Sequence, residues 1–357
     1  MSELLVLVGT EKGAFTARYD ESSARWHTSG PHLPGWEVSA LTLAGSGKPK
    51  LLAGTTHYVY GATIRSSDDM GATWQEQPGS PAYDSERGFK MNRIWTIERT
   101  ASGSLFAGVD EAGIFRSDDD GRTWAELRAL TDHPTRANWS PGNGGLCLHT
   151  IVHDPNDEQR MWVAISAVGV FRTDDGGETW ELKTRGIPPV ATGGDGVGID
   201  RCVHRIALDP GDSQTLYMQF HGGVFRSTDA ADSWHSIEAG LPSNFGFPLV
   251  TGKPRELFVA PLDSDERRYM PEGRLRVFRS RDGGENWQDV SAGLPGDPQY
   301  VNVLRGAMAR DPGNVGGVLF GTTMGQVYAT HDSGESWQEL PLQLPRVLSV
   351  TAHRLGA

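Results

Sequence analysis

Cysteine is scarce in this chain of 357 residues, which contains two. Two cysteines cannot build the disulfide framework of a small secreted domain. Long apolar runs are also missing, because no stretch reaches the roughly 20 residues of a membrane-spanning helix. The apolar run within residues 1–9 is short and lacks a basic start, so we expect no secretory signal. These absences predict a cytoplasmic protein without a membrane partner.

The chain also has no excess of basic residues over acidic ones. The formal net charge is −12 at pH 7, which argues against nucleic acid and against an anionic membrane surface as partners. No long segment has the 3.6-residue periodicity of an amphipathic helix. The chain is therefore expected to be an all-β protein whose partners are neither nucleic acid nor a membrane.

A repeated tryptophan is what the sequence does contain. It recurs about every fifty residues, a period typical of stacked supersecondary units, at Trp26, Trp74, Trp124, Trp180, Trp234, Trp287 and Trp337. Short β-rich runs lie between the copies, such as 105–109 and 113–117. Four short strands per repeat predict the blade of a β-propeller, and seven repeats predict seven blades.

The residues before each tryptophan form a short box. Ser117, Asp119, Gly121, Thr123 and Trp124 illustrate the frame Ser/Thr-x-Asp-x-Gly-x-Thr-Trp. Ser, Thr and Asp side chains hydrogen-bond nearby backbone in tight turns, and glycine permits a positive φ. The tryptophan should pack between neighbouring sheets. We therefore assign the boxes a structural role and not a catalytic one.

Seven blades account for the whole chain as a single domain, 1–357. The N-terminal repeat lacks a first strand, and residues 347–352 are predicted to supply it, so that the C-terminal strand joins blade one and closes the ring. The other first strands are predicted at 38–43, 93–98, 148–153, 203–208, 247–251 and 303–309. Four long loops, at 77–92, 128–147, 183–202 and 261–274, should lie on the face opposite the boxes, where binding and chemistry usually occur.

The repeated frame resembles the Asp-box, or BNR repeat, which occurs in sialidases, xyloglucanases, sortilin-type receptors and photosystem II assembly factors. Residues 141–149 and 245–248 extend the similarity to a bacterial group commonly labelled exo-sialidase or glycosyl hydrolase with BNR-like repeats. The resemblance implies a seven-bladed propeller and a glycosidase-like activity. It does not transfer sialidase catalytic residues, because sialidases have six blades and their Arg-Ile-Pro signature is replaced here by Arg93, Ile94 and Trp95.

Histidines and arginines near the predicted loop face are the candidate site residues. Cys147 and His149 occupy the same register as Cys202 and His204 in the next blade, and residues two apart share one face of a strand. A site of two cysteines and two histidines would require neighbouring blades to face one another, and equivalent residues point the same way round a propeller. We instead propose His149, His204 and His221 as ligands of a divalent metal, and His149 and His204 also as acid–base groups.

The arginines suit an anionic substrate, because guanidinium groups bind carboxylates and phosphates with paired hydrogen bonds. Arg93 and Arg305 are assigned to the catalytic centre, and the residues expected to bind substrate are Arg201, His57, Asp200 and Tyr300. Two carboxylates at a suitable separation would support glycoside hydrolysis. The candidates on the loop face are Asp84, Glu86, Asp110, Glu111, Asp195, Asp200, Asp263, Asp265 and Glu266.

Two functional hypotheses follow. The first is a hydrolase or lyase that acts on a small anionic or carbohydrate-like molecule at the loop-side mouth of the central pore, with a divalent metal as the cofactor to test for. The second is a non-enzymatic scaffold resembling the photosystem II assembly factors, with a protein partner at the same face. The sequence leaves the substrate, the reaction and the oligomeric state open.

Overall fold

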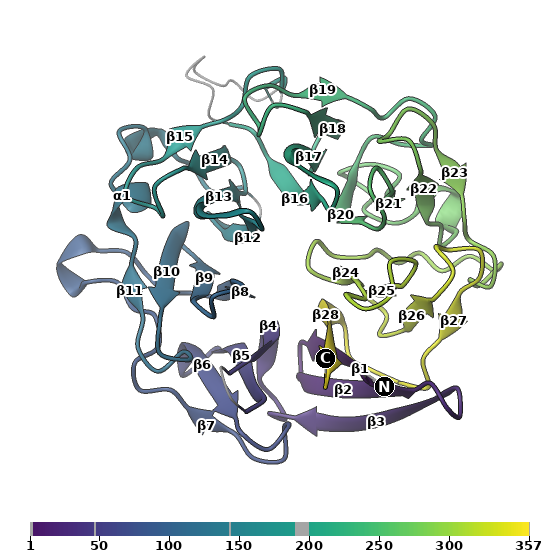
Figure 1. Ribbon diagram of the computed structural model, residues 1–357, viewed down its shortest axis with the longest axis horizontal. Helices are drawn as coiled ribbons and strands as arrows, with labels where there is room; N and C mark the ends of the chain where they lie inside the picture. Colours follow the sequence, from purple (N-terminus) through teal and green to yellow (C-terminus); the bar gives the residue numbers. More distant parts are fainter. Residues whose placement is uncertain (1–2, 46–47, 143, 190–199, 357) are drawn as a thin grey trace. The chain divides into compact units, whose positions relative to one another are not determined.

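The computed structural model describes residues 3–45, 48–142, 144–189 and 200–356. Within them the chain forms seven four-stranded sheets, and neighbouring strands follow one another along the chain except where β28 lies beside β1 (Figure 1). Every strand pair whose register is known is antiparallel, from β1 with β2 to β26 with β27. The predicted fold class is confirmed: the protein is an all-β, seven-bladed β-propeller.

Contacts group the residues into two compact units, which are described separately. Residues 35–203, with 231–233, form one unit. It contains blades two to four, whose strands are β4 (Glu37–Ala44), β5 (Lys50–His57), β6 (Gly61–Ser67), β7 (Gln75–Glu76), β8 (Ile94–Arg99), β9 (Leu105–Val109), β10 (Gly113–Ser117), β11 (Ala125–Glu126), β12 (Leu148–Asp154), β13 (Asp157–Ile165), β14 (Gly169–Thr173) and β15 (Glu181–Leu182). Its described loops contain single turns of helix at η1 (Ser85–Arg87), α1 (Arg128–Thr131) and η2 (Arg136–Asn138). The prediction of a single domain stays a prediction.

Residues 1–34, 204–230 and 234–357 form the other unit. It contains blades one, six and seven and, apart from the first residue of β16, the strands of blade five. The strands are β1 (Glu3–Thr10), β2 (Gly13–Asp20), β3 (Arg25–His32), β16 (Val203–Asp209), β17 (Asp212–Phe220), β18 (Gly223–Ser227), β19 (His235–Ser236), β20 (Gly246–Thr251), β21 (Leu257–Pro261), β22 (Phe278–Ser280), β23 (Gln288–Asp289), β24 (Met308–Arg310), β25 (Val318–Gly321), β26 (Val327–Thr330), β27 (Gln338–Glu339) and β28 (Val347–Leu355). One further turn, η3 (Pro271–Gly273), lies in the loop before β22.

The two ends of the chain meet in blade one, as the sequence predicts. β28 pairs antiparallel with β1, from Glu3 opposite Leu355 to Thr10 opposite Val347, and the sheet order is β28-β1-β2-β3 (Figure 1). β1 is buried almost throughout because it has a strand on either side and apolar neighbours on both faces. This pairing supplies the missing first strand and leaves no open edge on β1.

The Asp-boxes form the turns between the third and fourth strands. In the box of blade four, Asp175 accepts hydrogen bonds from the hydroxyl groups of Thr173 and Thr179 and from the backbone N–H of Thr179. The Thr173 hydroxyl also accepts from the N–H of Gly177, whose φ is 99°. The turn is closed by its own side chains, as expected for a structural motif.

The box tryptophans are less uniform than the sequence suggests. Trp180, Trp234 and Trp337 are buried, whereas the other four are half-exposed. Trp337 donates to the carbonyl of Val290 at the end of the preceding blade, whereas Trp124 donates to Gly121 within its own turn. Only some tryptophans therefore link successive blades as predicted.

Predicted first strands agree with the structure to within about a residue, with two exceptions. The strand predicted at 347–352 continues to Leu355 in β28. Residues 303–309 were expected to be a strand, but β24 covers only Met308–Arg310. Residues 304–307 form a turn instead, in which the N–H of Ala307 donates to the carbonyl of Leu304.

Candidate functional site

Chemically active side chains gather where first strands begin and second strands end. Two groups result. The histidine cluster consists of Cys202, His204 and His221, and the acid cluster consists of Glu37, Arg93, Trp95 and Asp110. Each group is held by strand ends on the side of the blade opposite its Asp-box, which is where the sequence places the functional face.

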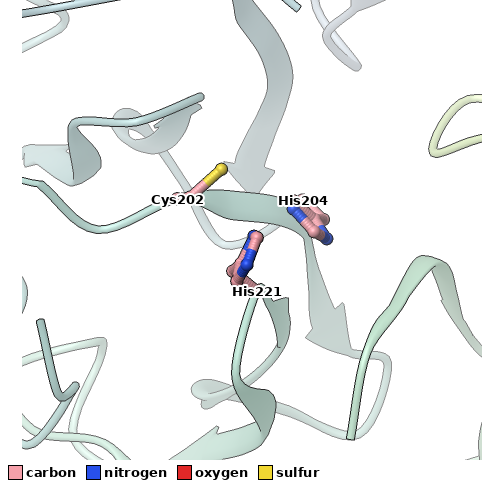
Figure 2. A group of neighbouring side chains, drawn as sticks. All are labelled: Cys202, His204 and His221. Atoms are coloured by element: carbon pink, nitrogen blue, oxygen red, sulfur yellow. The ribbon is translucent and has the colours of Figure 1, made fainter. Parts of the chain in front are cut away.

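The histidine cluster comes from blade five. Cys202 directly precedes β16, His204 is its second residue, and His221 opens the turn between β17 and β18 (Figure 2). One ligand atom from each residue lies within 4.8 Å of the others. His204 is buried, and the rings of the two histidines meet edge to face with centroids 5.6 Å apart. A thiol and two imidazoles thus converge from three points of a single sheet.

Each imidazole of this cluster is oriented by an oxygen acceptor. His204 Nδ1 donates to the carbonyl of Gly246 at 2.5 Å. His221 Nε2 lies 3.1 Å from a carboxylate oxygen of Asp265, which belongs to the long insertion after β21. These bonds select the tautomers in which His204 Nε2 and His221 Nδ1 carry the lone pair. The insertion therefore has a defined contact with the cluster.

Two phenylalanines wall the histidines. The Phe247 ring lies 4.7 Å and the Phe245 ring 5.4 Å from the ring of His204, centroid to centroid, and both phenylalanines are buried. Arg305 and Arg268 place their guanidinium carbons 5.7 and 5.9 Å from the centroid of Phe247. An apolar wall with two cations over it is suited to an anionic group near the histidines.

The acid cluster is centred on a buried carboxyl. Asp110 follows β9, is 9% exposed, and accepts a hydrogen bond from Trp95 Nε1. Burial raises the pKa of Asp110 to about 6, against the lowering effects of the Trp95 hydrogen bond and the Arg93 charge. The Arg93 guanidinium is 2.5 Å from a carboxylate oxygen of Glu37 and stacks over the Trp95 ring. Two carboxyl groups in different environments therefore lie near one arginine.

Exposed aromatic rings stand beside the acid cluster. Trp36 precedes Glu37 in the chain. Its ring stacks with that of Tyr60 at 6.0 Å and is tilted against that of His57 at 5.0 Å, centroid to centroid, and the Arg65 guanidinium carbon lies 4.1 Å from its centroid. Tyr58 and Tyr60 are 95% and 73% exposed. We call Trp36, His57, Tyr58 and Tyr60 the aromatic platform. The exposed rings of Tyr58 and Tyr60 are suited to stacking against a ring of a ligand, whereas Trp36 and His57 are half-buried.

The other residues predicted for the site belong to neither the histidine cluster nor the acid cluster. His149 is buried, with Nε2 3.0 Å from the Val203 carbonyl and Nδ1 2.8 Å from the Thr150 hydroxyl. It does not belong to the group that brings His204 and His221 together. Among the described residues, the third member of that group is Cys202, which is not among the ligands proposed from the sequence.

Arg201 donates to the backbone carbonyls of Ile187 and Asp200, and Asp200 itself has a φ of 75°. Tyr300 is 67% exposed and packs edge to face on Tyr269. Arg201 and Asp200 thus serve a local turn in this structure, and Tyr300 presents its ring at the surface. Asp195, another carboxylate considered above, lies outside the described residues.

Sequence reasoning named Asp110 among nine carboxylates without selecting it. The signals were present: Asp110 follows the fully apolar strand β9, and Trp95 lies in the neighbouring strand β8. What the sequence does not show is that the Trp95 indole and the Asp110 carboxyl meet in the fold.

Among the described residues, no helix has the length and apolar character needed to cross a membrane.

Comparison with known proteins supports the repeat and the fold. The BNR/Asp-box repeat model matches residues 171–182. Xyloglucanase Xgh74A of Acetivibrio thermocellus is 27% identical over 248 residues, which is 60% of this chain and 26% of that protein. The chain thus spans about a quarter of the length of this relative.

Two solved structures share the architecture. A putative 6-phosphogluconolactonase from Bacteroides uniformis aligns with a TM-score of 0.59 and 15% identity, over 99% of this chain and all of the other. YCF48 bound to D1 peptide aligns with a TM-score of 0.54 and 14% identity, over 86% of this chain and 84% of the other. At such identities the likeness shows the fold alone. With its repeated boxes, its seven sheets and its joined termini, the chain is a seven-bladed β-propeller that carries BNR/Asp-box repeats.

Proposed function

We propose that the protein is a hydrolase that acts on carbohydrate and that the acid cluster is its chemical centre. The observation that carries the proposal is the buried carboxyl of Asp110, which is held by the Trp95 indole and has a pKa raised to about 6 by burial. A carboxylic acid that stays protonated close to neutral pH can donate a proton to the leaving oxygen of a glycosidic bond.

Glycoside hydrolysis also needs a second carboxylate, which acts as base or nucleophile. Glu37 fits that role, because its carboxylate is ion-paired with Arg93 at 2.5 Å. Arg93 also lowers the pKa of Asp110, so one guanidinium interacts with both carboxyl groups. In this arrangement Asp110 supplies the proton and Glu37 supplies the negative charge, while Arg93 holds Glu37 in place.

The aromatic platform supports a sugar as substrate. Trp36 is directly next to Glu37 in the chain, and Tyr58 and Tyr60 expose most of their ring area. Apolar faces of sugar rings stack on such side chains, and the few polar groups nearby then fix orientation. The alignment with Xgh74A points in the same direction and makes xyloglucan and its oligosaccharides the first substrates to test.

The experiment is an assay of reducing-sugar release from xyloglucan, its oligosaccharides and aryl glycosides. We expect Asp110→Asn to lower kcat by about 10²–10⁴-fold with little change in KM, because the proton donor is lost. In the wild type, kcat should decline as the pH rises through about 6, where Asp110 ionises. Glu86→Gln, on an exposed turn of the same unit, is the matched control. Full activity of Asp110→Asn on an identified substrate would refute the assignment.

A scaffold that binds a protein partner is the second candidate. The turn formed by Tyr58, Val59 and Tyr60 is the observation in its favour, because all three side chains are large and exposed. Replacement of both tyrosines by alanine separates the two functions. A loss of kcat/KM on a carbohydrate supports the hydrolase, whereas loss of a specific protein complex with no turnover of any glycoside supports the scaffold.

A further inference from the structure

We propose that the histidine cluster is a zinc site, in which the thiolate of Cys202 and the imidazoles of His204 and His221 bind one Zn²⁺ ion. The site lies on blade five and shares no residue with the acid cluster. It therefore does not rest on the proposed carbohydrate function and can be tested without any substrate.

The donor set selects the metal. A thiolate and two imidazoles are the ligands that zinc prefers, whereas magnesium and calcium prefer oxygen. The three ligand atoms lie within 4.8 Å of one another. Around a tetrahedral zinc ion, ligand atoms at the usual bond lengths are about 3.4–3.6 Å apart. Side-chain rotations that bring the ligand atoms about an ångström closer together would therefore complete the coordination, without movement of the strands.

The surroundings of the two imidazoles match those of metal ligands. A zinc-bound histidine usually donates its other ring N–H to a carboxylate or a backbone carbonyl. Here His221 Nε2 faces Asp265 and His204 Nδ1 donates to Gly246, so both arrangements occur in one cluster. The carboxylate of Asp265 in particular reaches the cluster from a separate loop.

The shell around the cluster favours tight binding with one position left for a ligand. Phe245 and Phe247 cover the rings of the histidines and keep the local dielectric low. Three protein ligands are typical of zinc sites that keep a fourth position for water or a substrate atom. Arg305 and Arg268, stacked over Phe247, favour an anion at that position.

The test is metal binding by the purified full chain, with zinc and cobalt chloride as the probes. After chelation and reconstitution, we expect about one equivalent of zinc per chain. Cobalt(II) should give the intense d–d absorption of a tetrahedral site together with a thiolate charge-transfer band. Cys202→Ser should abolish that band, and His221→Asn should lower zinc affinity by at least about 100-fold. Cys147→Ser, at the equivalent position of blade four, should leave both signals unchanged.

The contribution of Asp265 gives a second and independent readout. Asp265→Asn keeps the size of the side chain but removes its charge, so we expect zinc affinity to fall by about 10–100-fold, with the cobalt spectrum retained. Both Cys202→Ser and Asp265→Asn change partly exposed side chains, so the folded state should survive. A wild-type chain that takes up no stoichiometric zinc, or a cobalt complex without a thiolate band, would overturn the proposal.

Discussion

At the scale of single residues, environment and not identity separates the candidate carboxyl groups. Asp110 and Glu111 are neighbours in sequence, yet Asp110 is buried, whereas 36% of the Glu111 side chain is exposed. Burial and the indole of Trp95 give Asp110 a raised pKa near 6. Sequence reasoning could place both residues on the functional face, because both follow a second strand. It could not choose between them, since desolvation depends on chain segments that meet only in the fold.

Asp110 should also make the protein less stable at high pH. Because the pKa of this carboxyl is raised from 3.8 to about 6 in the folded state, stability falls as the pH rises from about 4 to about 6 and then stays level. Asp110→Asn mimics the protonated form and keeps an oxygen for Trp95. We expect this variant to be about 1–3 kcal/mol more stable than the wild type at pH 8 and nearly equal to it at pH 4.

Urea unfolding at pH 4 and pH 8 measures this difference, with Glu86→Gln as the control that should change stability little at either pH. A variant Asp110→Asn that is less stable than the wild type at pH 8 would mean that the ionised carboxylate stabilises the fold. A stabilised variant that has also lost activity would fit an acid retained for catalysis at the expense of stability.

At the scale of elements, strand positions followed from the repeat, whereas the insertions did not. First strands such as β12 and β16 begin at the predicted residue because apolar runs and Asp-Pro turns bound them. The strand expected at 303–309 is shorter because residues 304–307 form a turn, closed by a hydrogen bond from the N–H of Ala307 to the carbonyl of Leu304. A contact between an insertion and another blade also has no local signal in the sequence. The same limit hid the approach of Asp265 to His221.

The C-terminal strand β28 is held to blade seven by a buried ion pair that can be tested. Arg354 donates Nε and one terminal nitrogen to the two carboxylate oxygens of Asp311, at 2.9 and 2.5 Å, and the Asp311 side chain is fully buried. These hydrogen bonds raise the pKa of Arg354 above its usual range. Arg354→Ala would leave Asp311 buried without its arginine, so we expect unfolding to cost about 3–5 kcal/mol less.

The matched control is the pair of Arg346 with Glu11, which joins the entry to β28 with the turn after β1. It is separated by 3.6 Å, and both side chains are nearly half exposed. Arg346→Ala should therefore lower stability by less than about 1 kcal/mol. Equal effects of Arg354→Ala and Arg346→Ala in urea unfolding would show that burial does not set the strength of the Arg354 pair.

At the scale of the whole molecule, the repeat specifies the architecture and is silent about the chemistry. Each box closes one turn with its own side chains, so six similar boxes and one eroded copy predict seven blades without any knowledge of a ligand. Both candidate sites are built from residues outside the boxes, such as Trp95, Asp110, His204 and His221. A fold inferred from its repeats therefore supports several functions, and only the side chains at the strand ends discriminate among them.

The Asp-boxes should determine the pH at which the folded protein loses stability in acid. Hydrogen bonds from the last polar side chain of the box lower the pKa of Asp69, Asp175 and Asp282 from 3.8 to about 2. A carboxyl whose pKa is depressed in the folded state contributes stability that is complete above about pH 4 and is lost as the pH falls through about 2. Since these turns recur in successive blades, we expect one cooperative acid transition between pH 4 and pH 2. Asp175→Asn should cost about 1 kcal/mol at pH 7 and weaken this pH dependence. Thermal melting from pH 2 to pH 7 measures both effects, and a wild-type melting temperature that stays level down to pH 2 would show that the boxes contribute no charge-dependent stability.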